Sequence, residues 1–264
     1  MIIFFILLAG INSISQSQEK SEWKTYFDEY NVKGSFVLYD SKNDRFACYD
    51  SSRCAEGFIP ASTFKIPNSI IGLETGVIPD ENYVIKWDGI KRSIEAWNHD
   101  LDMKSAILVS AVPYYQELAR RVGEERMKEM VRLLNYGNMD ISGGIDKFWL
   151  EGSLRISQFE QIAFLRKLYN NELPVSLRSM EITKKILPSE DTLGFRIHAK
   201  TGYDNQDDKY IGWWVGWAEK DTDVYFFAIN IESENPGSSF LDARKSITRN
   251  ILNDFITNNN NGEK

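Results

Sequence analysis

A hydroxyl group and an amine stand three residues apart in the apolar stretch from Ile59 to Asn68, at Ser62 and Lys65. In a helix, positions i and i+3 lie on one face, roughly 5–6 Å apart at Cβ. A lysine that has lost its charge accepts the serine proton there, which activates the serine as a nucleophile. The spacing alone is weak evidence, because a serine N-cap followed by a solvated lysine also produces it.

A second motif, Lys200-Thr201-Gly202, strengthens the catalytic interpretation. A Ser-x-x-Lys motif followed later by Lys-Thr-Gly is characteristic of proteins that form an acyl bond on a serine. The triplet falls on a predicted strand, where a glycine lets a substrate backbone approach closely. The two motifs together predict a serine nucleophile served by two lysines.

The composition limits the classes of partner. The chain has 264 residues, of which 42% are hydrophobic, and this suits one large domain or two intimately packed subdomains. Its 31 basic and 38 acidic residues give a net charge of −7, and no basic run is visible. Nucleic acid is therefore not expected as a partner, and recognition of an anionic ligand has to be local.

The N-terminus resembles an export signal. Residues 1–10 are almost wholly apolar and are followed by Ser13-Ile14-Ser15, a small-x-small pattern, although Lys and Arg are missing from the start. The apolar run is shorter than the roughly 20 residues of a membrane-spanning helix, and no lipobox cysteine follows. We expect a cleaved signal peptide at 1–15, a single mature domain at 16–264 without a stable membrane anchor, and a periplasmic location.

The two cysteines, Cys48 and Cys54, both follow this leader. In an oxidising compartment they are candidates for a disulfide that closes a short loop, worth roughly 2 kcal/mol on the chain-entropy model. The alternative is a pair of unpaired thiols.

The pattern of elements predicts how the motifs are brought together. Strands are expected at 34–39, 45–49, 195–201, 210–218 and 224–231, and helices at 62–73, 114–122, 124–134, 158–169, 176–187 and 241–255. Strands at both ends of a helical middle predict one sheet built from about 20–60 and 190–258, with a helical subdomain at about 61–189 inserted. The cleft between the two halves is the natural place for a site.

Six segments together resemble the class D beta-lactamases, the oxacillinases, in content and in order. They are Pro60–Gly76, Ser110-Ala111-Val112, Tyr136-Gly137-Asn138, Phe148–Gly152, Lys200-Thr201-Gly202 and Trp213–Trp217. The resemblance runs from about Gly34 to the last helix. It implies a mixed α/β fold, with an antiparallel sheet flanked by helices and packed on an all-helical subdomain, and it implies hydrolysis of beta-lactam antibiotics.

The resemblance assigns the central chemistry to three residues. Ser62 attacks the beta-lactam carbonyl to give an acyl-enzyme. Lys65 is similar to the family's lysine that reacts with carbon dioxide or bicarbonate to become N6-carboxylysine, a general base for acylation and deacylation. Lowering a lysine pKa by about three units to free the amine costs roughly 4 kcal/mol. Trp149 corresponds to the tryptophan that holds the carbamate, although an ordinary core aromatic is the alternative.

Further roles follow from the same resemblance. Ser110 is similar to the second serine, which relays a proton between Lys200 and the leaving nitrogen, whereas alone it is an ordinary helix-boundary serine. Val112 stands where class A enzymes have an asparagine, which argues against that class. Val112 and Leu150 are expected to line the substrate site and to keep the surroundings of Lys65 apolar.

The oxyanion hole and the carboxylate site complete the set. The resemblance places the hole at the backbone N–H groups of Ser62 and Tyr203, next to Gly202. Thr201 and Arg244 are expected to bind the substrate carboxylate, a guanidinium being suited to it through a bidentate fork. A surface arginine is the plain alternative for Arg244.

Some residues are expected to play no direct part. Tyr136-Gly137-Asn138 is interpreted as support for the cleft, and His99 and His198 are left without a catalytic role. No cofactor other than carbon dioxide is expected, and no metal, because zinc-ligand spacings are missing from the sequence. Two rival functions stay open: a beta-lactam sensor that traps the acyl state, and a transpeptidase-like penicillin-binding domain. The preferred beta-lactams and the oligomeric state are not predicted.

Overall fold

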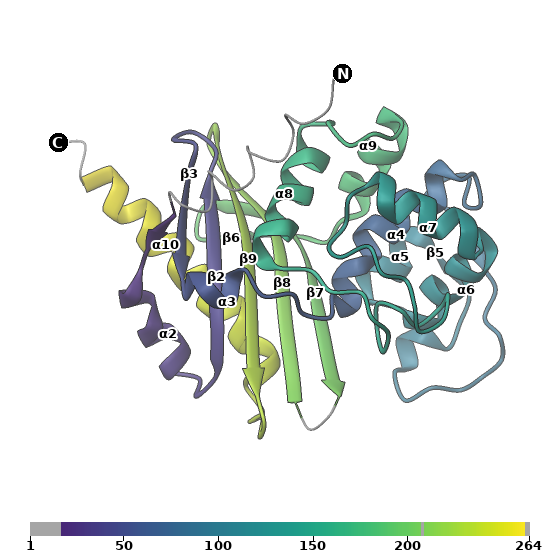
Figure 1. Cartoon of the computed structure of the whole chain (residues 1–264), viewed down its shortest axis with the longest axis horizontal. Helices are drawn as coiled ribbons and strands as arrows, with labels where there is room; N and C mark the ends of the chain where they lie inside the picture. Colours follow the sequence, from purple (N-terminus) through teal and green to yellow (C-terminus); the bar gives the residue numbers. More distant parts are fainter. Residues whose placement is uncertain (1–16, 207–208, 262–264) are drawn as a thin grey trace, which may run out of the picture.

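A seven-stranded sheet forms the centre of the computed structural model, which describes residues 17–206 and 209–261 (Figure 1). Its order is β1-β3-β2-β9-β8-β7-β6. The strands are β1 (Gln18–Glu19), β2 (Lys33–Asp40), β3 (Arg45–Tyr49), β6 (Ser189–Thr192), β7 (Phe195–Gln206), β8 (Lys209–Lys220) and β9 (Asp223–Ser233). All neighbours pair antiparallel except β1 and β3, which run parallel. The predicted sheet from both ends of the chain is confirmed.

Helices cover the sheet and fill the inserted middle of the chain. They are α2 (Lys24–Asp28), α3 (Ser51–Cys54), α4 (Lys65–Glu74), α5 (Met103–Leu108), α6 (Val112–Val122), α7 (Glu124–Leu133), α8 (Gln158–Tyr169), α9 (Leu177–Ile186) and α10 (Phe240–Asn261), with 3₁₀ turns η1 (Ser21–Trp23), η2 (Ala61–Phe64) and η3 (Glu95–Trp97). A small ladder joins β4 (Val84–Ile85) to β5 (Leu101–Asp102). In Figure 1, α4 to α7 and α9 gather beside the sheet next to β7.

Two hydrophobic cores lie on opposite faces of the sheet. Successive side chains of a strand point to opposite faces, so a strand buried on both sides is apolar throughout. In β2, Val37 and Tyr39 belong to the core that includes α8 and the helical half, while Phe36 and Leu38 belong to the core under α10. The sheet is therefore a middle layer, and the helical half is continuous with only one of its faces.

Several details differ from the prediction. Helix α5 was not predicted, although Asp102 caps it by accepting a hydrogen bond from the Ser105 backbone N–H. Helix α10 continues to Asn261, beyond the predicted end at Phe255. Elongating an existing helix adds one hydrogen bond for each residue fixed, so a polar end can remain helical. The predicted helix at 62–73 begins with the 3₁₀ turn η2 and becomes α-helical from Lys65.

The disulfide prediction needs correction, because both cysteines are free and buried. The Cys54 thiol donates to the carbonyls of Phe36 and Tyr49, each at 3.5 Å, and the Cys48 thiol donates to Glu19 at 3.5 Å. Burial raises the pKa of the Cys48 thiol to about 11, and it raises that of Cys54 as well. Each thiol has its own acceptor and stays protonated, so the alternative of two unpaired thiols holds in this structure.

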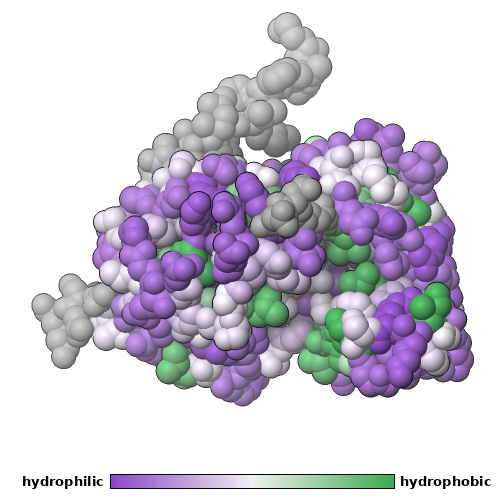
Figure 2. All heavy atoms as spheres, turned by 90° about the horizontal axis from the view of Figure 1, so that it is seen from below, coloured by the Kyte–Doolittle hydropathy of each residue, from purple (hydrophilic) through white to green (hydrophobic). Residues whose placement is uncertain are grey.

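The surface and the leader add two observations. Figure 2 shows a face on which hydrophilic residues predominate and hydrophobic ones lie in small separate groups. Within the described ranges, no helix is long and apolar enough to cross a membrane. The predicted signal peptide at 1–15 lies outside the described residues.

Candidate active site

Ser62 and Lys65 lie at the junction of η2 and α4, with Lys65 Nζ 2.6 Å from Ser62 Oγ. The chain enters this junction through Ala61, which has a φ of +47°. That left-handed conformation is costly for a residue with a Cβ and persists only where the surroundings enforce it. Pro67 is the third residue of α4, where the backbone has no intrahelical acceptor for an N–H. The helix therefore starts directly at the catalytic pair.

Lys65 is fully buried, and no carboxylate pairs with it in the part of the chain that the structure describes. Its Nζ lies 5.6 Å from the centroid of the Tyr115 ring, and its other surroundings are the larger hydrophobic core. Burial, and secondarily the charge of Lys200, lower the pKa of Lys65 well below its usual value. Burial therefore favours the neutral form of the amine, the form that a base or a nucleophile needs.

Trp149 stacks on Phe64, the residue before Lys65, with ring centroids 5.4 Å apart and an interplanar angle of 24°. The indole is completely buried. Its Nε1 has no acceptor among the described residues. A buried N–H without a partner is costly, so this donor is poised for an acceptor brought by a ligand or a modification.

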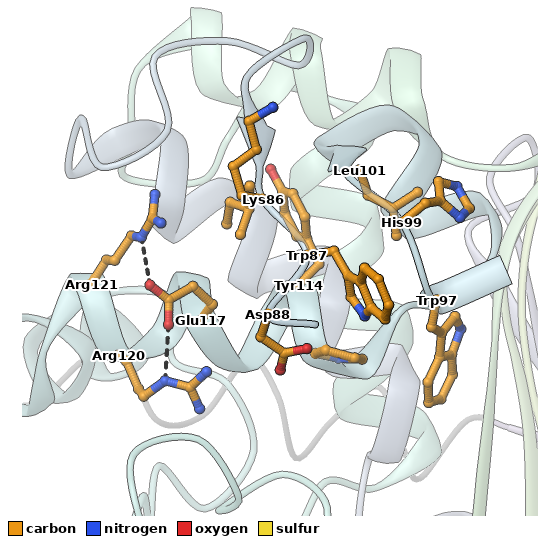
Figure 3. Close-up of a pocket in the computed structure, with 12 residues that line it drawn as sticks. Lys86, Trp87, Asp88, Trp97, His99, Leu101, Tyr114, Glu117, Arg120 and Arg121 are labelled. Carbon is orange, nitrogen blue, oxygen red and sulfur yellow. Dashed lines mark hydrogen bonds and ion pairs between the residues drawn. The ribbon is translucent and has the colours of Figure 1, made fainter. Parts of the chain in front are cut away.

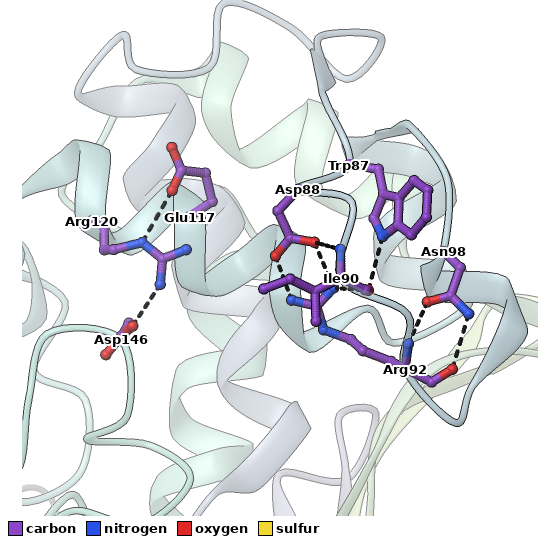
Figure 4. A network of polar contacts seen from close by, with 8 residues as sticks. All are labelled: Trp87, Asp88, Ile90, Arg92, Asn98, Glu117, Arg120 and Asp146. Atoms are coloured by element: carbon purple, nitrogen blue, oxygen red, sulfur yellow. Dashed lines mark hydrogen bonds and ion pairs between the residues drawn. The ribbon is translucent and has the colours of Figure 1, made fainter.

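The loop that carries Trp149 is held from both sides. Asn138 donates its amide to the Ser153 carbonyl at 2.9 Å and accepts from the Arg155 N–H at 3.0 Å. From α6, Arg120 reaches the Asp146 carboxylate at 2.6 Å (Figure 4). Asn138 thus acts as cleft support, as expected.

The same loop closes on itself through two glycines. A Cβ added to Gly143 would lie 2.6 Å from the Cα of Gly152, and one added to Gly152 would lie 2.5 Å from the Ser142 carbonyl oxygen. Real Cβ atoms do not approach other atoms so closely. The neck of the Trp149 loop is therefore a backbone-to-backbone contact.

Ser110 occupies the left-handed position of a Schellman motif at the end of α5. Its φ is +54°, the Ala111 N–H bonds to the Ala106 carbonyl at 2.8 Å, and the Ser110 N–H bonds to the Ile107 carbonyl at 3.3 Å. Glycine is the usual residue there because it carries no Cβ. A serine at this position brings a hydroxyl to Lys200, and its left-handed backbone conformation costs conformational energy.

Lys200 meets this hydroxyl from the other half of the molecule. Its Nζ is 3.0 Å from Ser110 Oγ and 2.9 Å from the Thr201 carbonyl, with Thr201 Oγ1 at 3.4 Å. Burial, then the charges of Arg244 and Lys245, lower the pKa of Lys200 to about 7. A group with this pKa exchanges protons readily near neutrality.

Gly202 lies where the sheet meets the turn that carries Ser62. A Cβ there would lie 3.0 Å from the Pro60 carbonyl oxygen and 3.1 Å from Thr63 Cγ2, so the glycine lets β7 pack directly on η2. This contact brings the backbone of Tyr203 next to the Ser62 turn. The Tyr203 side chain itself is 41% exposed and packs toward Tyr210.

Arg244 reaches the same strand from α10. Its guanidinium donates to the Gly202 carbonyl at 2.5 Å, while its Nε is buried without a partner in the described chain. Burial lowers the pKa of Arg244 to about 10, which leaves it charged at neutral pH. A buried cation with an unused N–H suits a carboxylate ligand.

The two apolar candidates lie on separate elements. Val112 is the first residue of α6 and is half-buried. Leu150 follows Trp149 and packs partly buried against the larger core. The structure thus pairs Ser62 with Lys65 and Ser110 with Lys200, and it packs Trp149 against the turn that carries Ser62. Val112 and Leu150 lie partly buried on two other segments.

A hollow of about 250 Å³ opens beside Lys200. Leu108 of the helical half and Lys245 of α10 line it, as does Pro188 just before β6. The sheet contributes the rest of the lining: Ser189, Glu190, Ile197, Ala199, Lys200, Thr201 and Trp214. The lining from both halves agrees with a site in the cleft between them.

Another hollow, of about 280 Å³, lies behind the cleft between the 85–101 segment and α6 (Figure 3). Its charges are internally paired, since Glu117 holds both Arg120 and Arg121. None of the predicted site residues lines it. Its relevance is indirect: Trp97, in its wall, donates to the Val109 carbonyl at 3.0 Å, one residue before Ser110.

The sequence did not reveal Trp97 or Tyr115 as neighbours of the site. Trp97 sits in an irregular segment in which Asp88 binds Arg92 and Asn98 closes a ring with the Arg92 backbone (Figure 4). Tyr115 follows Pro113 in an ordinary amphipathic helix, and its hydroxyl lies 2.8 Å from Ser69 Oγ. Nothing in the sequence around Tyr115 indicates that it contacts α4, because that contact arises only when α6 packs on α4.

The histidines stay outside the pairs described above. His198 stacks on Trp217, with ring centroids 5.4 Å apart, and burial lowers its pKa. His99 lines the hollow behind the cleft. In the described residues no group of three or more His, Cys, Asp or Glu is placed to hold a metal ion.

Comparisons with known proteins agree with this geometry. Residues 24–253 match the family model of the penicillin binding protein transpeptidase domain. Beta-lactamase OXA-48 of Klebsiella pneumoniae is 47% identical over 246 residues, covering 93% of this chain and 92% of the relative. Beta-lactamase OXA-5 of Pseudomonas aeruginosa is 46% identical over 255 residues, covering 96% and 94%. The crystal structure of FUS-1 (OXA-85), a class D beta-lactamase from Fusobacterium nucleatum, superposes with a TM-score of 0.84 at 41% identity, covering 90% and 98%.

Two substitutions of Ser110 separate the energetic cost of its left-handed backbone from the effect of losing its hydroxyl. Ser110→Gly relieves the left-handed strain, whereas Ser110→Ala keeps it, and both remove the contact with Lys200. We expect the glycine variant to be more stable than the alanine variant by about 1–2 kcal/mol, or roughly 2–4 °C in melting temperature. Calorimetry of the two proteins measures this difference. Equal melting temperatures would contradict the strain assigned to Ser110.

The buried amine of Lys200 predicts a pH-dependent stability. Its pKa is about 7 in the folded chain against 10.5 as the ordinary value, so only the unfolded chain binds this proton between these pH values. Stability therefore rises from about pH 7 toward pH 10, by up to about 1.4 kcal/mol per pH unit, and levels off below pH 7. Urea unfolding at pH 7, 8 and 9 should show this slope reduced in Lys200→Met and retained in Lys245→Met. The same slope in all three proteins would rule the assignment out.

Proposed function

The chain belongs to the class D beta-lactamases, and on that premise we propose that it opens the beta-lactam amide through an acyl-enzyme on Ser62. The enzyme is a hydrolase, and beta-lactam antibiotics are its proposed substrates. The observation that carries the proposal is the 2.6 Å contact between Ser62 and a fully buried Lys65 without a carboxylate partner among the described residues.

Acylation uses the two lysine-serine pairs in turn. Ser62 Oγ forms a bond to the beta-lactam carbonyl carbon as its proton passes to the base at Lys65. When the ring C–N bond breaks, the leaving nitrogen takes a proton from Ser110 Oγ, which the Lys200 amine 3.0 Å away replaces. The Lys200 pKa of about 7 suits both the loss and the recovery of that proton.

Two groups of donors orient the substrate. The backbone N–H groups of Ser62 and Tyr203 face the carbonyl oxygen and stabilise its negative charge in the tetrahedral state. Arg244 and Thr201 bind the carboxylate that beta-lactams carry. The unused, buried Nε of Arg244 supports this role.

We further propose that Lys65 is N-carboxylated. Carbon dioxide reacts only with a neutral amine, and the pKa of Lys65 is held far below its usual value. A carbamate is an anion that needs donors in a dry pocket, and the unpartnered N–H of Trp149, whose ring stacks on Phe64 next to Lys65, is such a donor. When present, the carbamate supplies an oxygen base for Ser62 and for the deacylating water.

The location is proposed with the function. A hydrolase of antibiotics that attack the cell wall acts where they enter, so we propose the periplasm, reached through the leader at 1–15.

Turnover separates an enzyme from a sensor. The purified protein should hydrolyse nitrocefin continuously, and Ser62→Ala should remove the activity. Absorbance kinetics, with mass spectrometry of the acylated protein, measures both. A single stoichiometric burst without further turnover would indicate a beta-lactam sensor, and acylation at another residue would contradict the role of Ser62.

Bicarbonate dependence tests the carboxylated lysine. Trp149→Phe retains an aromatic ring next to Phe64 and removes the N–H together with one ring of the indole. We expect this variant to need about tenfold or more bicarbonate for half-maximal activity, since one hydrogen bond to a charged group is worth about 1.5–3 kcal/mol. Lys65→Ala should stall at the acyl-enzyme whatever the bicarbonate concentration. Indifference of wild type and Trp149→Phe to bicarbonate would remove the proposal.

A further inference from the structure

A buried polar chain runs from α8 to the nucleophile turn. Gln161 donates from Nε2 to Thr63 Oγ1 at 3.0 Å, and Thr63 Oγ1 donates to the Pro60 carbonyl at 2.7 Å. The Tyr136 hydroxyl donates to Gln161 Oε1 at 3.4 Å. Gln161 and Thr63 are 1% and 0% exposed, so water does not compete for these bonds.

The chain of bonds fixes the direction of one proton. A threonine hydroxyl has a single hydrogen to donate. Because its oxygen accepts from Gln161, its proton is left to point at the Pro60 carbonyl. The Thr63 backbone N–H also donates to that carbonyl, at 3.1 Å. The Pro60 oxygen is therefore held twice by Thr63.

This carbonyl is also the point where the turn touches the sheet. A Cβ on Gly202 would lie 3.0 Å from the Pro60 oxygen. One residue after Pro60 is Ala61, whose φ of +47° has to be enforced from outside. The neighbouring carbonyl of Ile59 is pinned separately by Trp213 Nε1 at 2.9 Å.

We propose that Gln161 is a positioning residue that sets the spacing of the oxyanion-hole amides through Thr63 and Pro60. The two amides belong to Ser62, two residues after Pro60, and to Tyr203, one residue after Gly202. Whatever moves the Pro60 carbonyl against Gly202 changes the distance between the two donors. The inference rests on the proposed function, since it concerns the hole assigned there, and it adds a residue that touches no substrate.

The position of the amides matters most in the tetrahedral state. Preorganised donors act on the charge that develops there, and the loss of one donor lowers kcat by about 10²–10³-fold. A displaced donor retains part of this effect. The ground-state complex depends mainly on the carboxylate contacts of Arg244 and Thr201, which Gln161 does not reach.

Gln161→Met is the direct test, because methionine keeps the length and removes both polar atoms. We expect kcat for nitrocefin to fall by about tenfold, while the dissociation constant of the non-covalent complex changes less than about twofold. In difference infrared spectra, the ester carbonyl of the acyl-enzyme should move to higher wavenumber, since weaker hydrogen bonds polarise it less. A role in stability alone moves neither readout.

Gln158→Met is the matched control. Gln158 lies one turn earlier on α8, is equally buried, and donates to the Ser35 and Ala228 carbonyls of the sheet at 2.9 and 2.7 Å, away from the turn. It should lower the melting temperature and leave kcat and the carbonyl band near wild type. The same kcat for Gln158→Met and Gln161→Met, per folded molecule, would overturn the proposal.

Variants of Thr63 test the same proposal if Gln161→Met does not fold. Thr63→Val should lose activity like Gln161→Met, Thr63→Ser should recover it, and the double variant should be no slower than the worse single variant. Wild-type activity in Thr63→Val would overturn the proposal. If wild type itself forms no acyl-enzyme on Ser62, the proposed function fails; if wild type turns over normally and only these effects are missing, the inference alone fails.

Discussion

The withdrawal of two lysine amines from water is the constraint on which the site depends. Lys65 and Lys200 are both buried, and burial is the main cause of their lowered pKa values. A buried charged lysine without a carboxylate partner is costly, so burial shifts each amine toward its neutral form. The aromatic packing around Lys65, with Phe64 stacked on Trp149 and Tyr115 near the amine, contributes to this shift.

Two of the ten non-glycine residues with a positive φ in the described chain lie beside the candidate site. Ala61 and Ser110 both have a positive φ, and each stands at or beside a reactive hydroxyl. The surrounding contacts over-determine both positions: β7 and Thr63 hold the first, and a Schellman motif with the Trp97 hydrogen bond holds the second. The local backbone preference is violated at these points because the sheet and the helical half supply enough packing to enforce it.

The sequence predicted the sheet, five of its seven described strands and most of the helices, because alternation and helical spacing are local properties; the short edge strands β1 and β6 were missed. It also placed Ser62, Lys65, Ser110 and Lys200 in one site, since the motifs are short and ordered. It did not predict the packing of Gly202 on Pro60, which depends on a strand and a turn about 140 residues apart meeting at one carbonyl. Trp97 and Gln161 were missed for the same reason: each acts through a backbone carbonyl or a hydroxyl that only the folded chain brings near. The cysteine bridge was wrong because spacing says nothing about the acceptors available to each thiol.

The loop that carries Trp149 is closed by a contact between Gly143 and Gly152. The shape of this loop therefore depends on backbone packing at the two glycines. Gly143 and Gly152 meet backbone to backbone, so no side chain contributes to the closure. Residues between them can therefore differ without entering the backbone contact that closes the loop. Evolution can therefore change side chains of this loop while the glycine contact keeps the Trp149 indole in place. A side chain at Gly143 or Gly152 would instead force the backbone apart and displace Trp149 from Phe64.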